Sequence, residues 1–579
     1  MWVIVILIFF STLSSAQTGD HIDWPRWCGK AYLPEHGSFN PGGQTVEPPV
    51  LHKRALNVQF KPRHSVYLAD EGEGEFVVSA QVSKYFGRPW PNLKGASRAP
   101  RVDFTITLDA TGQILVQDRF KVKHRINRFK FEVGKVKPRL EPYQVTLQAR
   151  TSKGKGEFDF NVTGELFVLP EKKKGTTTRI DNLSGGLFYR NSTSRNGFEP
   201  FLPYGFFAPC DGFLCDGANT IPKIKAYRDR RLKTMVPMMP ISAASRPIFD
   251  YMDSVDLRFM YDLRHSYKNL TALQEQIAAI KDSDALYAYW GFDQPDGHQD
   301  LLAPIWKAGS LIRNLDPYHP VAVTLNCQNY HFGEYTRAAD IIMENVYPMG
   351  ARTTVSKWGT PCNSTYGNCG CDNCDGAVTD VSSRLRDMAQ YEQWLNLWPK
   401  PKIHNLQSFS GGENRLLGGP NADEIVAMSA LALNHGAKGI IPWIWPVDDK
   451  LAAVHGKFAN AVNKGRARDL IAKTTAKRHS VRGYPDLDIS YWLLNRTMVM
   501  SMVNTGNVSH IGPIRIDFPK IQPTHVMDII WGNAAYDLRE IEEPYGMKLH
   551  AFGVDAMSTN IISSMVCCDN YPSLSKEFD

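Results

Sequence analysis

An apolar run in the middle of the sequence ends in a cluster of polar side chains. In "YAYWGFDQPDGHQD", residues 287–300, hydrophobic residues give way to Asp293, Gln294 and Asp296. A cluster of this kind either caps a turn or carries chemistry. Carboxyl groups accompanied by amides and aromatic rings suit the hydrolysis of a glycosidic bond, in which one carboxyl protonates the leaving oxygen and a second attacks or stabilises the sugar cation.

Glu344, in "DIIMENVYP", is the candidate for the second carboxyl group. We expect Asp293 to act as the acid or as an orienting carboxylate, and Glu344 as the nucleophile or base, with Asp296 able to replace Asp293. Taken singly, each acid could instead cap a loop or pair with an arginine. Their common position at predicted strand ends favours the catalytic role.

These acids belong to a repeating pattern of strands and helices. Eight short apolar strands recur from about residue 200 onwards: "FLPYGFFAP", "KTMVPMMP", "DLRFMYDLR", "LYAYWGFDQ", "PVAVTLN", "DIIMENVYP", "KIHNLQSF" and "AKGIIPWIWP". Most are separated by segments long enough for a helix, and one such segment offers Asn421 as N-cap and Gly436 as its end. Eight strand and helix repeats predict a closed (β/α)₈ barrel. The alternative is an open doubly wound sheet, which usually contains a Gly-rich phosphate-binding turn that this sequence lacks.

The C-terminal strand ends of such a barrel form its functional face. Side chains expected to bind substrate there can hydrogen-bond to hydroxyl groups or stack on sugar rings: Gln294, Asp296, His265, Tyr347, Gln407, Trp443 and Trp445. The same strand ends also offer Asp211, Asp262, Arg264, Asn326, Asn345, His404 and Asn405. We expect a carbohydrate partner, no organic cofactor and no metal.

Residues on both sides of the barrel have the period-two pattern of antiparallel sheets. On the N-terminal side, apolar residues alternate with polar ones, as at Phe104, Ile106 and Leu108. Segments typical of β-strands occur again after about residue 480. The polar stretch "PEKKKGTTTRIDNLSGG", at 170–186, is predicted to be a linker. The expected units are a signal peptide at 1–16, an N-terminal β-sandwich with the linker at 17–185, the barrel at 186–478 and a small C-terminal β-sandwich at 479–579.

The first residues are typical of a secretory signal. An apolar run at 3–10 is followed by small residues before an expected cleavage site after Ala16, and no later stretch is long enough to span a bilayer. Seven sequons fit an exported glycoprotein: Asn161, Asn182, Asn191, Asn269, Asn363, Asn495 and Asn507. We therefore expect a soluble extracellular protein.

Ten cysteines in an exported chain are expected to form disulfides. Four lie close together in "CNSTYGNCGCDNCDG": Cys362, Cys369, Cys371 and Cys374. Zinc is the alternative for this cluster, but the embedded sequon and the lack of paired CxxC motifs favour disulfides. Cys210 and Cys215 could close a second loop, and the adjacent Cys567 and Cys568 could each bridge outward.

The net charge of +7 is small for 579 residues and does not indicate a nucleic-acid partner. The most basic stretch, "KVKHRINRFKFEVGKVKPR" at 121–139, alternates with apolar residues, which indicates a solvated sheet face. Contact with an acidic polysaccharide is the alternative for this stretch.

Several longer motifs carry a family resemblance: "PYGFF", "DQPDG", "LDPYHPVAVTLNCQNYHF", "ADIIMENVYP", "CGCDNCDG" and "GAKGIIPWIWP". Through them, residues 170–480 resemble secreted, mainly fungal, glycoside hydrolase-like proteins of the (β/α)₈ superfamily. The resemblance implies the barrel fold and a hydrolase ancestry, but no particular reaction or substrate.

The sequence departs from the common pattern of such barrels at the fourth strand. That strand commonly ends in Asp-Glu-Pro or Asn-Glu-Pro with Glu as the acid/base residue, and here Gln294 takes its place. An amide delivers no titratable proton, and loss of acid/base help typically costs about 10²–10⁴-fold in rate. The seventh strand, "IHNLQSF", also has no acid. Three interpretations remain open: a hydrolase that uses Asp293 and Glu344, a former hydrolase that only binds glycans, and a scaffold whose β domains do the binding.

Overall fold

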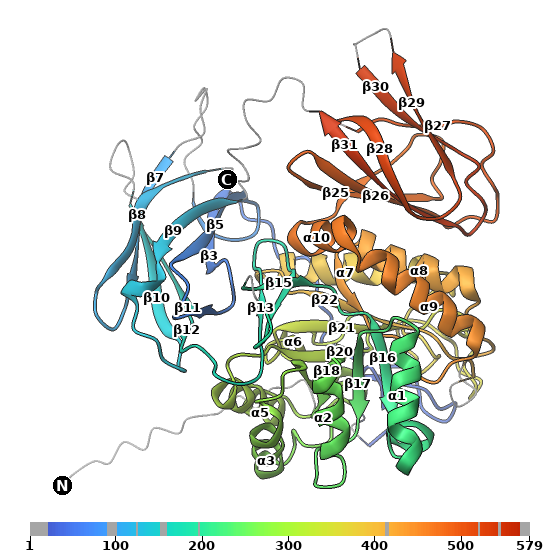
Figure 1. The fold of residues 1–579 in the computed structure, drawn as a ribbon, viewed down its shortest axis with the longest axis horizontal. Helices are drawn as coiled ribbons and strands as arrows, with labels where there is room; N and C mark the ends of the chain where they lie inside the picture. Colours follow the sequence, from blue (N-terminus) through green and yellow to red (C-terminus); the bar gives the residue numbers. More distant parts are fainter. Residues whose placement is uncertain are drawn as a thin grey trace.

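The computed structural model describes residues 21, 23–89, 101–122, 126–150, 159–194, 197–411, 416–518, 521–541 and 546–567. The expected signal peptide and Cys568 lie outside the described residues. A parallel barrel forms the centre of the fold, and antiparallel sheets flank it on two sides (Figure 1).

Eight parallel strands form the barrel in sequence order: β16 (Gly205–Pro209), β17 (Thr234–Met238), β18 (Arg258–Asp262), β19 (Leu286–Asp293), β20 (Val321–Leu325), β21 (Ile341–Val346), β22 (Lys402–Leu406) and β23 (Ala437–Ile440). The last strand meets the first, because the N–H of Ile440 donates to Pro203 O (2.9 Å) and that of Phe207 to Pro442 O (3.1 Å). The predicted (β/α)₈ barrel is confirmed.

Helices follow every strand of the barrel: α1 (Thr220–Asp229), α2 (Arg246–Ser254), α3 (Leu270–Ile280), α4 (Pro295–His298), α5 (Leu302–Leu315), α6 (Phe332–Thr336), α7 (Thr379–Trp394), α8 (Ala422–Asn434), α9 (Asp449–Val462) and α10 (Gly465–Lys473). Asn421 caps α8 as predicted, in a capping box with Glu424. None of the helices in the described ranges combines the length and apolar character that a membrane crossing needs.

The barrel interior is a packed core. Phe207, Val236, Met260, Trp290 and Met343 form one buried cluster inside it, whereas alternate strand residues pack against the surrounding helices in a second, larger cluster. This separation follows from the period-two alternation of side chains along each strand.

A three-stranded sheet closes the N-terminal end of the barrel. It consists of β13 (Thr177–Ile180), β14 (Leu187–Arg190) and β15 (Glu199–Phe201), and its apolar side chains join the inner cluster of the barrel. Every residue of β13 is buried. The linker prediction at 170–186 is therefore wrong for these four residues, because three of them, Thr177, Thr178 and Ile180, have β-branched side chains that favour a strand.

The N-terminal domain is the predicted β-sandwich. One sheet contains β3 (Ala55–Pro62), β5 (Glu73–Ser83), β6 (Arg88–Pro89) and β9 (Asn127–Glu132), and the other contains β7 (Arg101–Leu108), β8 (Ile114–Lys121), β10 (Tyr143–Arg150) and β11 (Asp159–Leu166). Side chains from both sheets, such as Phe76 and Phe104, form its own core. The short pairs β1 (Arg26–Trp27) with β2 (Lys30–Ala31) and β4 (Tyr67–Leu68) with β12 (Val168–Leu169) lie outside these sheets.

The C-terminal domain also has two sheets. The larger contains β24 (Lys477–His479), β25 (Leu487–Leu494), β26 (Thr497–Asn504), β28 (Gln522–Trp531) and β31 (Thr559–Cys567), and the smaller contains β27 (Ile514–Ile516), β29 (Ala535–Ile541) and β30 (Gly546–Phe552). Trp492, Val499 and Val503 pack into the large barrel cluster, which ties this domain to the helices. The domain boundaries at 185 and 478 stay predictions.

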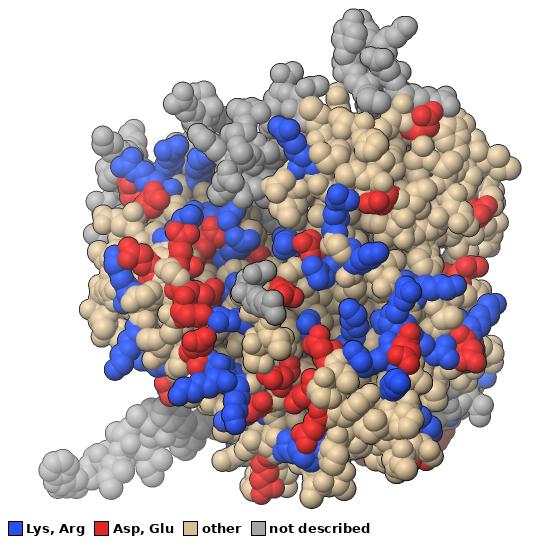
Figure 2. Space-filling model, in the orientation of Figure 1, with Lys and Arg blue, Asp and Glu red and all other residues tan. Residues whose placement is uncertain are grey.

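Basic and acidic side chains are interspersed over the visible face of the molecule (Figure 2). In the basic stretch at 121–139, of which 123–125 lie outside the described residues, Arg128 pairs with Glu75 (2.7 Å) and Lys130 with Glu73 (3.0 Å). Such cross-strand pairs agree with the solvated sheet face that the sequence indicates.

Four disulfides are present in the described residues: Cys28–Cys327, Cys210–Cys215, Cys362–Cys369 and Cys371–Cys374. The expected pairing of the four clustered cysteines and of the Cys210 loop is confirmed. Cys567 is exposed and its thiol is free, so the expected outward bridge from it does not form. The first bridge spans 299 positions and joins the N-terminal segment to the barrel.

Removing the long-range disulfide should destabilise the protein more than removing a local one. Because loop-closure entropy grows with loop length, Cys28→Ala with Cys327→Ala should lower the free energy of unfolding by up to about 5 kcal/mol, against about 2 kcal/mol for Cys362→Ala with Cys369→Ala, whose separation is 7. Urea unfolding of the two double variants measures the difference. Equal losses would mean that the long bridge does not constrain the unfolded chain.

Candidate active site

The strand alternation decides which side chains reach the barrel mouth, defined here as the C-terminal ends of β16–β23. Trp290 of β19 pairs with Ala322 of β20, and Asp293 with Thr324. Trp290 and Ala322 both belong to the inner cluster, and paired residues of neighbouring strands point to the same side. Asp293 therefore faces the barrel axis, and its side chain is 20% exposed.

Arg264 joins Asp293 to a second inward-facing carboxyl group, that of Asp262 at the end of β18. Its Nε lies 3.1 Å from Asp262 Oδ2, and its Nη1 lies 3.5 Å from Asp293 Oδ2. The guanidinium stands 4.6 Å from the ring centroid of Trp290, in a cation–π contact that helps to position it. Two carboxyl groups on adjacent strands thus share one cation.

Both carboxyl groups keep their protons to a higher pH than a free aspartate does. Burial raises the pKa of Asp293 to about 6, Arg264 opposes this rise, and the charge of Asp262 adds to it. Burial also raises the pKa of Asp262 to about 6, again with Arg264 opposing. A carboxyl group with a pKa in this range can hold a proton near neutral pH and donate it to a leaving group.

Amide and hydroxyl groups from β21 and β22 form another side of the mouth. Asn405 Nδ2 donates to Asn345 Oδ1 (2.7 Å), which also accepts from the Tyr347 hydroxyl (3.1 Å). Burial raises the pKa of Tyr347 well above its ordinary value, and the charge of Asp293 adds to this rise. The hydroxyl is therefore neutral at physiological pH and able to hydrogen-bond to a sugar.

Three further predicted binding residues lie at the mouth. His265 is exposed, but its imidazole is partly covered by protein, and this partial burial together with the charge of Arg264 lowers its pKa. The half-buried Trp443 has its ring 5.1 Å from that of Phe207. Gln294 is half-buried, has a φ of 47°, and donates its backbone N–H to Thr324 O (2.9 Å).

Glu344 does not reach the mouth. Met343 belongs to the inner cluster and Ile342 to the cluster beneath the helices, so Glu344 points to the helix side of β21. Its carboxylate is fully buried and hydrogen-bonds to Nδ1 of His404. Among the described residues, Glu344 Oε2 and His404 Nε2 have no hydrogen-bond partner. The prediction that Glu344 works beside Asp293 is wrong, because the barrel wall separates the two carboxyl groups.

Asp296 also has a different place from the predicted one. It is buried, and its carboxylate accepts backbone N–H bonds from Gly297 (2.9 Å), Asn326 (3.1 Å) and Cys327 (2.8 Å). Burial raises its pKa to about 7, and these donors oppose the rise. Asp296 therefore holds the loops after β19 and β20 together and is not available to replace Asp293.

Gln407 and Trp445 are structural rather than substrate-binding residues. The fully buried Gln407 amide accepts from Met349 N (2.9 Å) and donates to Met349 O (2.9 Å), which fixes the loop after β21. The buried Trp445 ring packs against Tyr227, 5.0 Å between centroids, in the cluster shared with the helices. Neither side chain is free to meet a sugar.

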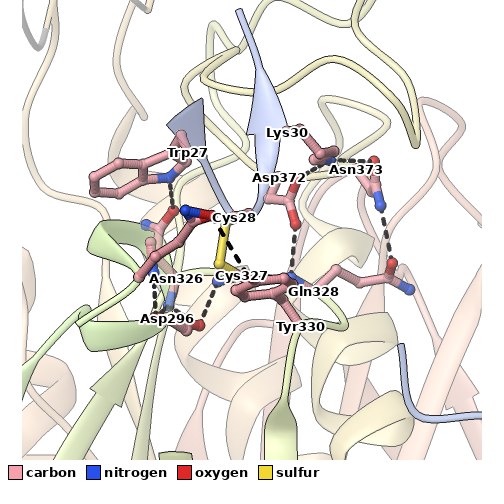
Figure 3. Close-up of a disulfide and its surroundings, with 12 residues drawn as sticks. Trp27, Cys28, Lys30, Asp296, Asn326, Cys327, Gln328, Tyr330, Asp372 and Asn373 are labelled. Carbon is pink, nitrogen blue, oxygen red and sulfur yellow. Dashed lines mark hydrogen bonds and ion pairs between the residues drawn. A yellow bond between two sulfur atoms is a disulfide. The ribbon is translucent and has the colours of Figure 1, made fainter. Parts of the chain in front are cut away.

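The strap, defined as residues 23–45, is a part of the site that sequence reasoning missed. Cys28 is bonded to Cys327 just after β20, and the buried Lys30 forms an ion pair with Asp372 (Figure 3). Cysteine counting could have found the bridge, because the other eight cysteines fall into a cluster of four and two close pairs. The sulfur atoms lie near Asp372 in a group with metal-ligand spacing, but they are bonded to each other and not available as thiolates.

Trp27 of the strap covers the turn that carries Asp296. Its indole Nε1 donates to Asn326 Oδ1 (2.7 Å; Figure 3). The Trp27 ring also meets the ring of His298 edge-on, with 4.9 Å between the centroids. A Cβ on Gly297 would lie 2.5 Å from the Trp27 ring. The close approach explains why glycine stands between Asp296 and His298.

No protein-family description and no curated protein matches this chain. Solved structures with similar features include a β-D-glucuronidase from Dictyoglomus thermophilum, at 13% identity and a TM-score of 0.33, covering 68% of this chain and 62% of that one. The match thus spans less than two thirds of that enzyme.

Two other solved structures cover more of this chain. A β-glucuronidase from Parabacteroides merdae matches at 9% identity with a TM-score of 0.33, covering 90% of this chain and 76% of that one. A candidate alpha-galactosidase from Bacteroides fragilis matches at 8% identity with a TM-score of 0.41, covering 91% and 99%. These values are too low to bear on the chemistry of this chain, and the fungal and secreted character that the motifs imply stays a prediction.

Neutralising Asp293 should stabilise the protein above pH 6. Because folding raises the pKa of this carboxyl from 3.8 to about 6, its contribution to stability is complete below about pH 4 and is lost as the pH rises through 6. The free energy of unfolding of Asp293→Asn should therefore exceed that of wild type by about 3 kcal/mol at pH 7.5 and come close to it at pH 4. Urea unfolding at both pH values measures this, with the exposed Asp109→Asn as control. A less stable variant at pH 7.5 would show that the Arg264 pair outweighs burial.

Glu344 should affect stability and not the chemistry at the mouth. Glu344→Leu leaves the His404 imidazole buried without its partner, which should cost about 3 kcal/mol. Glu344→Gln keeps an acceptor for Nδ1 and should cost less. Thermal unfolding ranks the two variants. If Glu344→Gln kept the stability of wild type but lost glycoside hydrolysis, Glu344 would have to be catalytic after all.

Proposed function

We propose that the protein is a secreted glycoside hydrolase whose reaction takes place at the barrel mouth, with Asp293 as the general acid. The observation that carries this proposal is the pair formed by Asp293 and Asp262, which lie on adjacent strand ends, share Arg264 and both have a pKa of about 6. Paired carboxyl groups with one proton between them suit proton transfer to a glycosidic oxygen.

The exposure of the two acids separates their roles. The Asp293 side chain is 20% exposed and that of Asp262 only 5%, so Asp293 is the group that can touch substrate. Asp262 is a positioning residue, because its negative charge helps to keep Asp293 protonated and its carboxylate orients Arg264. Ionised Asp262 also places negative charge beside the developing sugar cation.

The remaining groups at the mouth suit a sugar ligand. The half-buried Tyr347 offers a hydroxyl group for a sugar, the buried amides of Asn345 and Asn405 orient it, and Gln294 adds an amide directly beside Asp293. The half-buried Trp443 offers an aromatic surface for a pyranose ring.

Binding without turnover is the second candidate. It is favoured by Gln294, an amide at the position where similar barrels keep an acid, and by the sequestered Glu344, which leaves the mouth without that carboxylate. In this case the same side chains would hold a glycan at the barrel mouth without cleaving it.

Wild type and Asp293→Asn, tested on a broad polysaccharide panel, separate the two candidates. For a hydrolase, Asp293→Asn should lower reducing-end release by about 10²–10⁴-fold while glycan binding persists, and Asp109→Asn should leave both unchanged. Binding by wild type without release, with activity appearing in Gln294→Glu, would support the binding protein. No binding to any glycan would sink both candidates.

The pH profile tests the role of Asp262 separately. As the acid must be protonated, kcat/KM should fall above about pH 6. In Asp262→Asn the neighbouring charge is gone, so the pKa of Asp293 falls and this decline should begin at lower pH. A profile that stays in place would show that Asp262 does not tune the acid.

A further inference from the structure

A cavity of about 400 Å³ lies between the N-terminal sandwich and the end of the barrel opposite the mouth. Its walls come from β3 and β11 of the sandwich, from β13, and from the segments that precede β20, β21 and β22. The volume is within the range of small-molecule sites. It shares no residue with the proposed active site.

The charged lining of this cavity is unbalanced. Four basic and two acidic residues line it: Lys61, Arg313, Arg337, Lys400, Glu165 and Asp340. Arg313 pairs with Asp340 at 3.2 Å, and the guanidinium of Arg337 stands over the ring of Trp306 at 4.8 Å. Within the described part of the chain, Lys61 and Lys400 have no carboxylate within 4.0 Å of their Nζ atoms.

Lys61 is the less constrained of the two lysines. Its side chain is exposed to the cavity, and no hydrogen bond or ion pair of its Nζ atom occurs within the described residues. The surrounding protein nevertheless lowers the pKa of Lys61, because burial disfavours the ammonium and Arg313 adds to the effect, whereas the more distant carboxylates of Asp340, Glu165 and Glu392 oppose it. The ammonium thus faces the cavity with no carboxylate of the described residues in contact with it.

Lys400 adds a second ammonium nearby. Its Nζ donates to the carbonyl oxygens of Thr336 (2.7 Å) and Ala339 (2.8 Å). An ammonium group has three protons, so one remains to donate to a ligand. Burial lowers its pKa to about 8, Asp340 opposes this, and the charge of Lys61 adds to the lowering. The two ammonium groups therefore interact and repel each other.

We propose that this cavity binds a small oxyanion, a phosphate or a carboxylate, between Lys61 and Lys400. An anion would compensate the repelling charges and accept the protons that no carboxylate accepts, in hydrogen bonds that are about twice as strong as neutral ones. Hydroxyl groups of Ser65, Thr163 and Thr178 line the same cavity as neutral donors. The phenyl rings of Phe60 and Phe167 add apolar surface for the rest of an organic anion.

Inorganic phosphate and citrate test this site on the full-length protein, at an ionic strength held constant with sodium chloride. Titration calorimetry should detect binding of at least one of the two anions, and that anion should raise Tm. Lys61→Gln should weaken the binding at least about tenfold and abolish the rise in Tm. Lys130→Gln is the matched control, because Lys130 lies on the same domain, is 67% exposed and pairs with Glu73 outside the cavity.

The two anions distinguish the source of the oxyanion. Binding of phosphate alone would indicate a phosphate ligand, and binding of citrate alone would indicate a carboxylate ligand. Binding of both anions would indicate a site that selects for negative charge and not for a particular anion. The proposal is overturned if neither anion binds, or if Lys61→Gln binds as tightly as wild type. Since Lys61 has no partner to lose, its variant should fold with an unchanged or higher Tm without anion. Lys400→Gln, with loss of binding, would confirm the second contact.

Discussion

The geometry of the mouth depends on the buried carboxylate of Asp296. It accepts backbone N–H bonds from Gly297 in its own turn and from Asn326 and Cys327 beyond the next strand. A buried carboxylate is costly unless such donors surround it. The turn after β19 and the loop after β20 are therefore fixed to each other, and Asp293, three residues before Asp296, is held at the edge of that fixed unit.

The strap contacts the loops around Asp296 from outside the barrel. The disulfide from Cys28 attaches the strap to Cys327, whose backbone N–H donates to Asp296 (Figure 3). The other two donors to Asp296 are Gly297 and Asn326. Trp27 packs closely on Gly297 and hydrogen-bonds to the side chain of Asn326. Each of the three donors is thus held by covalent or packing contacts. The pKa of Asp293, about 6 beside Arg264, depends on this rigidity, because small displacements change ion-pair energies.

The sequence predicts the barrel well because eight apolar strands separated by helical segments leave few other folds. It does not predict the direction of Glu344, because all six residues of β21 are buried and "IIMENV" has no polar alternation that would show which face is which. The same limit applies to Gln407, which lies at a strand end but bonds to backbone. The strap bridge spans 299 positions, so only counting cysteines could have suggested it. The position of Asp293 at a strand end could be predicted because the turn that follows it is local in sequence.

The two ends of the barrel differ in how their charged side chains are paired. At the mouth, Arg264 stands between two carboxyl groups, so the cation there has carboxyl partners on two adjacent strands. At the far end, Lys61 and Lys400 face a cavity with no carboxylate in contact, although this end of a (β/α)₈ barrel usually contributes stability. Asp340 and Glu392 favour both ammonium groups only from beyond contact distance. The protons that face the cavity are therefore left for the anion that we propose.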